Sequence, residues 1–231
     1  MNSLRKIDLN ADLGEGGADD AALLGLVSSA NIACGGHAGD VETMSRTIDL
    51  AIASGVAVGA HPGYEDREHF GRRAMAFPLP QVSDLVARQV EKLATLAQAA
   101  GAPLHHVKPH GALYNQADRD ELFAAAVVAG ILRVSSRALL YAMPGSKLAA
   151  AGLAAGLTIC PEGFADRSYL ANGSLMPRNE PGAVIKDTAT ALVQALRLAK
   201  SGQIETLCVH GDAANAVLIL RAIRERLWST C

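Results

Sequence analysis

Aromatic residues, long apolar runs and clusters of basic residues are scarce in this sequence of 231 residues. Phe, Trp and Tyr make up only 4% of it, which argues against a base-stacking surface for nucleic acid. The 21 Lys and Arg residues form no cluster and are balanced by 23 Asp and Glu residues, so no nucleic-acid partner is expected. No run of about 18 uncharged apolar residues occurs, so no membrane-spanning helix is expected either.

Cysteine is sparse as well: its four residues stand far apart, and no Cys-x-x-Cys pair occurs. We interpret them as reduced, packed residues, although Cys34 in the segment Ala-Cys-Gly-Gly-His has an alternative interpretation as a nucleophile. The N-terminal stretch contains two basic residues and reaches Asp8 and Asp12 without an apolar segment. A signal peptide is therefore not expected, and the sequence favours a cytoplasmic location.

Hydrophobic residues, by contrast, make up half of the chain, and 19% of the residues are charged, which suits one sizeable core. Short apolar runs alternate with segments of helical period without a linker, so residues 1–231 are predicted to form a single domain. Strands are expected at residues 6–10, 30–33, 56–60, 105–108, 138–142, 157–160 and 206–210. Helices are expected at residues 40–53, 80–100, 120–132, 146–155, 187–200 and 213–227.

This alternation predicts an α/β fold with a parallel sheet, because parallel strands need crossover connections. An open doubly wound sheet and a closed (β/α) barrel both fit. Polar residues lie at or just after the predicted carboxyl ends of the strands: Asp8, Asn10, Asp12, His61, Lys108, His110, Glu162, His210 and Asp212. Only a barrel brings so many strand ends to one mouth. The sequence therefore favours a single-domain irregular (β/α) barrel of about seven strands.

The first polar segment offers a row of acidic and amide groups. Asp8, Asn10 and Asp12 alternate, so an extended strand places them on one side, where they are costly to bury without partners. Such a row can supply a general base or oxygen ligands for a cation. The structural alternative is that Asp12 caps a following helix.

Histidines follow three of the other strands. His37 lies in a glycine-rich turn whose amides can approach an anion, and Asp40 is expected to cap the next helix. His61 enters a Pro-Gly turn, and a catalytic and a structural role are both open for it. The last strand ends with His210 and with Asp212, which we interpret as a helix cap.

A second alternating row is formed by His106, Lys108 and His110, until Pro109 ends the strand. Lys108 is suited to stabilise a developing oxyanion, and His110 to move a proton. Further along the chain, Arg167 and Arg178 are candidates for gripping a carboxylate. Each motif is weak alone, and their common placement at strand ends is the stronger observation.

Several long segments of the sequence match motifs of a known protein family, and they follow one another in the same order as in that family. They are Asp-Leu-Asn-Ala-Asp-Leu-Gly-Glu at 8–15, Ser-Ser-Ala-Asn-Ile-Ala-Cys-Gly at 28–35, His-Ala-Gly-Asp at 37–40, Gly-Ala-His-Pro-Gly-Tyr at 59–64, His-Val-Lys-Pro-His-Gly-Ala-Leu-Tyr-Asn at 106–115, Phe-Ala-Asp-Arg at 164–167 and Cys-Val-His-Gly-Asp at 208–212. Together they resemble the LamB/YcsF family from residue 7 to about residue 224. Several long motifs in one order make this resemblance specific.

The resemblance implies a glycoside-hydrolase/deacetylase-like barrel. Members of the family are bacterial 5-oxoprolinase A subunits, so it also implies ATP-dependent opening of 5-oxo-L-proline to L-glutamate, in a complex with subunits B and C. ATP with Mg²⁺ is then the expected co-substrate of the complex, and no tightly bound organic cofactor is expected. Because the chain lacks the Gly-x-x-x-x-Gly-Lys-Ser/Thr phosphate loop, nucleotide activation is expected to depend on a partner subunit.

Under this hypothesis the candidate residues take roles. Asp12 or His61 is the general base, and Lys108 and His110 stabilise charge. Arg167 orients the substrate carboxylate. The expected substrate-binding residues are Asn10, His37, Glu162, Asp166, Arg167 and His210.

Two departures from related sequences bear on the site. Gly36 stands where the family usually has Phe, which is expected to widen the mouth beside His37. Asp12 is followed by Leu13, whereas related metal-dependent deacetylases carry adjacent Asp-Asp, so a transition-metal site is left open. Two alternative functions also stay open: a stand-alone metal-dependent deacetylase or amidohydrolase, and a non-enzymatic regulator of lactam utilisation. The first would place His37, His61 and His110 with an aspartate around zinc.

Overall fold

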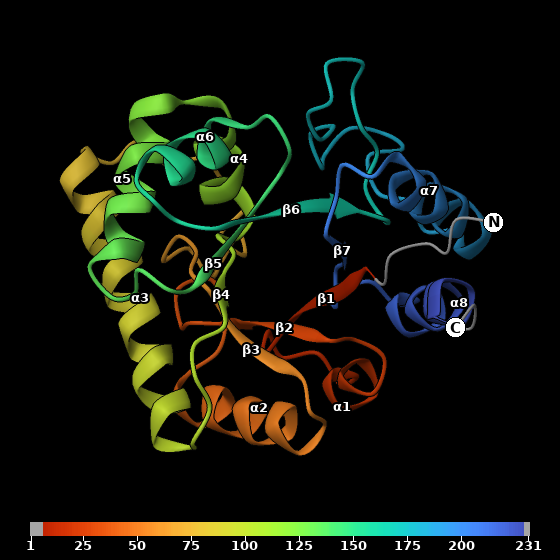
Figure 1. Ribbon diagram of the computed structural model, residues 1–231, viewed down its shortest axis with the longest axis horizontal. Helices are drawn as coiled ribbons and strands as arrows, with labels where there is room; N and C mark the ends of the chain where they lie inside the picture. Colours follow the sequence, from red (N-terminus) through yellow and green to blue (C-terminus); the bar gives the residue numbers. More distant parts are fainter. Residues whose placement is uncertain (1–6, 229–231) are drawn as a thin grey trace.

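The computed structural model describes residues 7–228, and its centre is a closed barrel of parallel strands (Figure 1). The strands are β1 (Asp8–Leu13), β2 (Ser29–Ala33), β3 (Ala57–His61), β4 (His106–Val107), β5 (Leu139–Ala142), β6 (Ile159–Phe164) and β7 (Thr206–Val209). Each strand pairs with the next, and β1 pairs with β7, with Asn10 opposite Cys208. The predicted irregular seven-stranded (β/α) barrel is confirmed.

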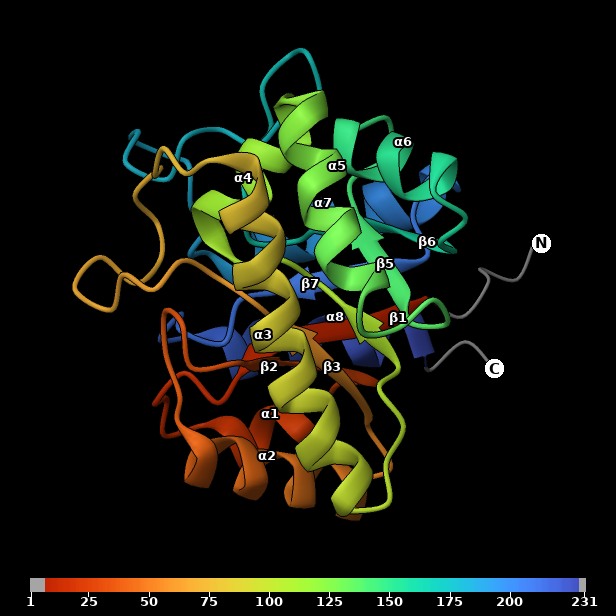
Figure 2. The ribbon, with the colours of Figure 1, turned by 90° about the vertical axis from the view of Figure 1, so that its left-hand side faces the viewer.

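Helices follow the strands and surround the barrel (Figures 1 and 2). They are α1 (Asp20–Leu24), α2 (Val41–Ala53), α3 (Leu79–Ala99), α4 (Gly111–Arg119), α5 (Glu121–Leu132), α6 (Lys147–Ala154), α7 (Thr188–Ser201) and α8 (Ala216–Trp228). The long α3 packs against α5, and α7 packs against α8. The predicted apolar stripe of α3 is buried, with Val82, Val86, Val90 and Leu93 fully inaccessible to solvent. None of the described helices combines the length and apolar character needed to span a bilayer.

The helix starts follow from side-chain caps. Asp40 accepts a hydrogen bond from the backbone N–H of Thr43 at 2.8 Å, as predicted for the start of α2. Equivalent caps begin α5, α6 and α7, and their capping residues are Asp120, Ser146 and Asp187. Each cap satisfies an N–H group that the first helical turn leaves without a partner.

Two strands extend by three or more residues beyond their predicted carboxyl ends. β1 ends at residue 13 rather than 10, and β6 ends at residue 164 rather than 160. Asp12 and Glu162 therefore lie inside strands, not after them. Pro161 and Gly163 have a low preference for strands, but pairing with β7 overrides this local preference. The predicted strand start at residue 6 falls outside the described residues.

Two short helices escaped prediction, for local reasons. α1 has only five residues, too few to show a helical period. α4 begins at Gly111, directly after Pro109 ends the two-residue strand β4. The predicted strand at 105–108 contains this shorter one, and α8 begins at Ala216 rather than at residue 213.

A hydroxyl network, here called the basal network, closes the amino-terminal end of the barrel. The carboxylate of Asp8 accepts hydrogen bonds from Ser28 and Ser29, both at 2.6 Å, and from Thr206 and Tyr141. The hydroxyl oxygen of Tyr141 also lies 3.1 Å from that of Ser29. The basal network thus ties four strands together through hydroxyl donors around one carboxylate.

Candidate active site

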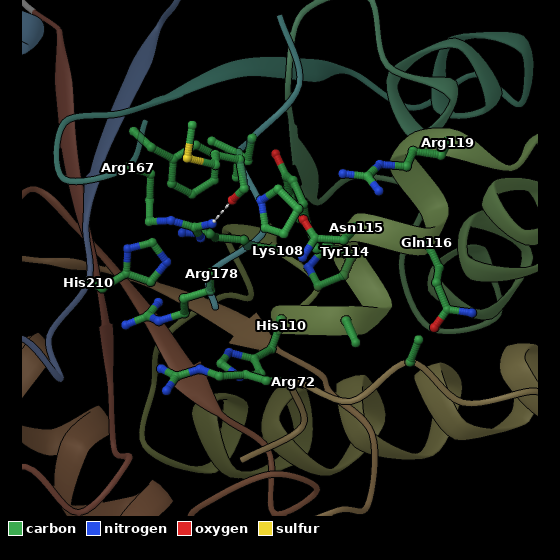
Figure 3. Close-up of a pocket in the computed structure, with 18 of the residues that line it drawn as sticks. Arg72, Lys108, His110, Tyr114, Asn115, Gln116, Arg119, Arg167, Arg178 and His210 are labelled. Atoms are coloured by element: carbon green, nitrogen blue, oxygen red, sulfur yellow. Dashed lines mark hydrogen bonds between the residues drawn. The ribbon is translucent and has the colours of Figure 1, made fainter. Parts of the chain in front are cut away.

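A cavity of about 910 Å³ lies at the carboxyl-terminal end of the barrel (Figure 3). It is bounded by the residues that end or follow β3, β4, β6 and β7. Of the predicted site residues, the following line it: Asp12, His61, Lys108, His110, Arg167 and His210. The remaining ones lie in the surrounding wall, where they contact lining residues: Asn10, His37, Glu162 and Asp166. The barrel thus brings the predicted residues together.

Lys108 is the central cation of the cavity wall. Its Nζ lies 3.1 Å from Asp12 Oδ1, 2.9 Å from Glu162 Oε1 and 2.9 Å from Cys208 Sγ. Burial lowers the pKa of Lys108, but Asp12, Cys208 and Glu162 together raise it by more than burial lowers it. The net pKa therefore lies well above its ordinary value. The residue is therefore an ammonium at neutral pH, with two carboxylates and a weakly accepting sulfur as partners.

Asp12 is held as an ionised carboxylate. Asn31 donates to its Oδ1 at 2.8 Å, and His61 Nε2 lies 3.5 Å from the same oxygen. Burial raises the pKa of Asp12, but His61, Lys108 and His210 outweigh it and hold that pKa well below its ordinary value. A carboxylate stabilised in this way is a weak base, which argues against Asp12 in the role of general base.

His210 and Asp166 form a carboxylate–imidazole pair at the cavity. His210 Nδ1 lies 3.0 Å from both carboxylate oxygens of Asp166, and its backbone N–H donates to the same group at 3.0 Å. Burial raises the pKa of Asp166, but the contacts with His210 lower it by more than burial raises it. The net pKa therefore lies below its ordinary value. Asp166 thereby fixes the proton of His210 on Nδ1 and leaves Nε2 free to accept a proton on the cavity side.

Three histidines gather beside this pair. His61 Nδ1 donates to the backbone carbonyl of Lys108 at 2.7 Å, and His110 Nε2 donates to that of Phe70 at 2.9 Å. His37 stacks on His110, with ring centroids 3.6 Å apart. Burial and the neighbouring histidines hold the pKa values of His37 and His110 well below their ordinary value. These two rings are therefore neutral at neutral pH.

Glu15 joins the histidines and was not among the predicted site residues. Its Oε1 lies 2.9 Å from His37 Nε2, 3.5 Å from His110 Nδ1 and 3.9 Å from His61 Nε2. Burial and the carboxylates of Asp12 and Asp212 raise its pKa well above the ordinary value. The signal in the sequence was its place in the acidic segment 8–15, three residues after Asp12.

Arginines form one side of the cavity rim (Figure 3). Arg72 and Arg178 both pair with Asp212, which lies after β7. Asp212 is therefore not the helix cap that the sequence suggested, since α8 begins four residues later. Arg167 donates to the backbone carbonyls of Met176 and Ala183 and lines the cavity.

In the glycine-rich turn, the expectation that Cys34 is a packed thiol is confirmed over the alternative of a nucleophile, and the expected widening at Gly36 is wrong. Cys34 is buried, its Sγ donates to the carbonyl of Ile32, and burial raises its pKa to about 12. It stays a thiol and is no nucleophile. A side chain on Gly36 would come within 2.7 Å of the Gln89 amide, so Gln89 fills this space and the mouth is not widened.

Solved structures share this architecture. A lactam utilization protein from Thermus thermophilus is 40% identical, with 97% of each chain covered and a TM-score of 0.90. The catalytic domain of a peptidoglycan N-acetylglucosamine deacetylase from Eubacterium rectale is 12% identical. That comparison covers 96% of this chain and 84% of the deacetylase domain, with a TM-score of 0.54, and shows a shared fold alone.

The closed strand order and the polar cavity at its carboxyl-terminal end define the class of protein. It is a (β/α)-barrel protein whose fold is shared with the lactam utilization protein and with the deacetylase domain. Within this class, the model of the LamB/YcsF family matches residues 7–230, and the chain belongs to that family.

Proposed function

We propose that this protein is the lactam-opening component of an ATP-dependent 5-oxoprolinase, which converts 5-oxo-L-proline to L-glutamate together with subunits B and C. Family membership and the 40% identity to a protein named for lactam utilization support this proposal. The observation that carries it is the cavity itself. Lys108, the Asp166-bound His210 and Arg167 meet around one space, which suits a small anion that must be hydrolysed.

The reaction needs activation because a five-membered lactam is a stable amide. Transfer of the γ-phosphoryl group of ATP to the lactam oxygen gives a reactive carbon. Water adds to that carbon, the C–N bond breaks, and a second water releases phosphate and leaves glutamate. The chain has no phosphate-loop sequence, so we assign the binding of ATP and Mg²⁺ to the partner subunits and the water addition to this one.

His210 is the best-placed general base for that step. His210 lines the cavity, its Nε2 lies 3.9 Å from Asp12 Oδ2, and Asp166 holds the tautomer that leaves this nitrogen unprotonated. Of the two bases predicted from the sequence, Asp12 already pairs with Lys108, and His61 Nε2 faces His110 Nδ1 at 2.9 Å. A base of this kind accelerates water addition by roughly 10²–10⁴-fold.

Lys108 is the proposed stabiliser of the negative charge that develops on the reacting oxygen. Two of its N–H groups face Asp12 and Glu162, and the third faces the sulfur of Cys208, while the amide oxygen of Asn10 is a more distant acceptor at 3.3 Å. Sulfur is a weak acceptor, so an oxyanion can take this third N–H at little cost. Arg167, on the same side of the cavity, is the proposed partner of the substrate carboxylate.

The histidine cluster supports a second candidate function, that of a stand-alone metal-dependent deacetylase or amidohydrolase. The observation in its favour is the group of Glu15, His37, His61 and His110, whose ligand atoms lie within 4.8 Å of one another. The polar residues that converge on the cavity give no support to a non-enzymatic regulator.

A glutamate-release assay separates these functions. The chain alone, subunits B and C alone, and the assembled complex are each given 5-oxoproline with and without ATP. We expect release only from the complex with ATP. Opening of 5-oxoproline at full rate by the chain alone with ATP would refute the division of labour. Deacetylation of N-acetylated substrates by the chain without ATP would favour the second function.

A further inference from the structure

Two imidazole nitrogens in the cavity wall, one from His61 and one from His110, face one another in a way that the other hydrogen bonds of their rings do not explain. His61 Nδ1 and His110 Nε2 each lie against a backbone carbonyl, at 2.7 and 2.9 Å. A carbonyl oxygen only accepts hydrogen bonds, so both of these nitrogens carry the ring proton. The lone pairs on His61 Nε2 and His110 Nδ1 then point at each other across 2.9 Å. Such a contact is repulsive unless a cation lies between them.

Glu15 adds a third electron donor to the same point. Its side chain is 7% exposed, and Oε1 lies 3.5 Å from His110 Nδ1 and 3.9 Å from His61 Nε2. Within residues 7–228, the ion-pairing contacts of this carboxylate are with histidines, and no Lys or Arg pairs with it. With its raised pKa this buried carboxyl keeps its proton when no cation is present, and a metal ion that binds it displaces that proton and supplies the compensating charge.

We propose that His61 Nε2, His110 Nδ1 and the Glu15 carboxylate bind one divalent first-row transition ion such as Zn²⁺, with His37 Nε2 as the fourth donor. A set of imidazole nitrogens and a carboxylate, without thiolate, suits these ions. Bonds of about 2.0–2.1 Å in a tetrahedron put the ligand atoms roughly 3.3 Å apart. Four of the six separations between these donor atoms lie between 2.9 and 3.9 Å, which brackets that value, and the ligand atoms of the group all lie within 4.8 Å of one another.

The surroundings of the cluster fix its rings in place. The two backbone carbonyls select the tautomers that point lone pairs inward, which is the usual arrangement around histidine ligands. The ring of His37 packs against Gly63 and Gly71, where an added Cβ would lie 2.6 Å from His37 Nδ1 and 2.8 Å from its Cβ, respectively. The glycines thus leave only the space that His37 fills.

The position of the cluster predicts an ion with one open side. His61 and His110 line the cavity, whereas Glu15 and His37 contact them from outside its lining. Donors on one side leave room for a further ligand from the cavity, which a zinc ion with four protein donors takes by expanding to five-coordination. The second group of ligand-type residues, Asp12, Cys208 and His210, is not a candidate. The ammonium of Lys108 already lies against the first two.

The test measures binding, so its result is independent of the proposed lactam chemistry. The full chain is stripped with a chelator, and Zn²⁺ is titrated by calorimetry and Co²⁺ by its visible spectrum. We expect one ion per chain, a Co²⁺ spectrum of low coordination number, and a rise in melting temperature with Zn²⁺. Mg²⁺ at the same concentration should not compete, because it prefers oxygen donors.

Two variants remove only the inward lone pairs. His61→Asn keeps a donor near the position of Nδ1, and His110→Gln keeps one near the position of Nε2, so the bonds to the carbonyls survive. Each should weaken Zn²⁺ binding by more than about 100-fold, exceeding the effect of losing a supporting residue. Glu15→Gln keeps the shape and should weaken it by at least about 10-fold. The matched control is His69→Asn, whose ring is 40% exposed and pairs with Asp66; it should bind as the wild type does.

Three results would overturn the proposal. The first is a wild-type chain without stoichiometric Zn²⁺ binding, which would leave a shared proton between the two rings. The second is wild-type affinity in folded His61→Asn and His110→Gln chains. The third is equal affinity for Mg²⁺ and Zn²⁺. If both ring variants fail to fold, the Glu15→Gln chain and the Zn²⁺-dependent melting temperature of the wild type decide. If the complex binds Zn²⁺ but does not open 5-oxoproline, the proposed function is refuted and the metal site is supported.

Discussion

Each end of the barrel buries one carboxylate of β1, and the two carboxylates have different kinds of partner. Asp8 belongs to the basal network, where four hydroxyl groups satisfy it. Asp12, four residues along the same strand, meets the ammonium of Lys108 and the ring of His61. The basal network holds one charge with neutral donors. The cavity end holds several charges and lone pairs that compensate one another only in part. Polarity alone thus does not mark the reactive end of a barrel, whereas incomplete charge balance does.

Lys108→Met should have the largest effect, because it removes the cation shared by Asp12 and Glu162. We expect turnover of the complex to fall by roughly 10²–10³-fold. The variant should also be less stable, because loss of one partner from a buried ion pair costs about 3–5 kcal/mol and Lys108 pairs with both Asp12 and Glu162. Lys108→Arg should rescue little activity, because a planar guanidinium does not replace a compact charge.

A double variant separates the two effects. Wild type holds one positive and two negative charges among these three side chains, and Lys108→Met with Glu162→Gln leaves one negative charge, so the net charge is the same. Urea unfolding should show that most of the lost stability returns, while glutamate release stays low. A Lys108→Met complex that keeps more than about a third of wild-type turnover would contradict the assigned role.

His210→Asn is the next change, and it tests the base at the same end. The Asn amide keeps a donor toward Asp166 and removes Nε2. Turnover should fall by about 100-fold or more with little change in stability. His69→Asn serves as the control. If the two variants release glutamate at similar rates, the base lies elsewhere.

Asp8→Ala probes the opposite end of the comparison. It leaves four hydroxyls without their shared acceptor and should lower the free energy of unfolding by about 3 kcal/mol. Turnover per folded molecule should change less than twofold, because the cavity does not include this residue. The measurements are urea unfolding and the glutamate assay at a temperature where the variant is folded. A large loss of activity in the folded variant would erase the distinction between the two ends.

Asp166→Asn should lower the free energy of unfolding by less than Asp8→Ala does, and with a defined pH dependence. The pKa of Asp166 lies below its ordinary value in the folded chain, so its interactions stabilise the fold above about pH 4 and are lost as the pH falls further. At pH 6 the variant should be less stable by about 1–2 kcal/mol, since a charged hydrogen bond is replaced by a neutral one. This difference should shrink below about pH 4 in urea titrations. A difference that stays constant across this acidic range would argue against an ionised Asp166.

The fold was predictable from the sequence where local chemistry and burial agree. Caps such as Asp40 and Ser146 mark helix starts, and the stripe on α3 marks a buried face. Pairing across the barrel overrode local preference at Pro161 and Gly163, so β6 was predicted too short. No window of sequence reports the register between neighbouring strands, which sets that end.

The sequence predicted which residues form the site but not how these residues pair with one another. Alternation placed Asp12, Lys108 and His110 at one mouth, and the structure agrees. The sequence could not show that Asp212 pairs with arginines from two distant loops, or that Glu15 turns toward the histidines. Those contacts depend on the path of loops between strands, which carry little periodic signal.

The pairing of Asp212 with Arg72 and Arg178 has a consequence for anything that enters the cavity. The two guanidiniums come from the loops after β3 and β6, and an internal carboxylate already holds them at the rim. An incoming anion does not meet bare positive charge; it must exchange with Asp212 for the same donors. Binding then reflects a difference between two similar interactions. Such an exchange favours selection among anions, moderate affinity and rapid release over tight capture.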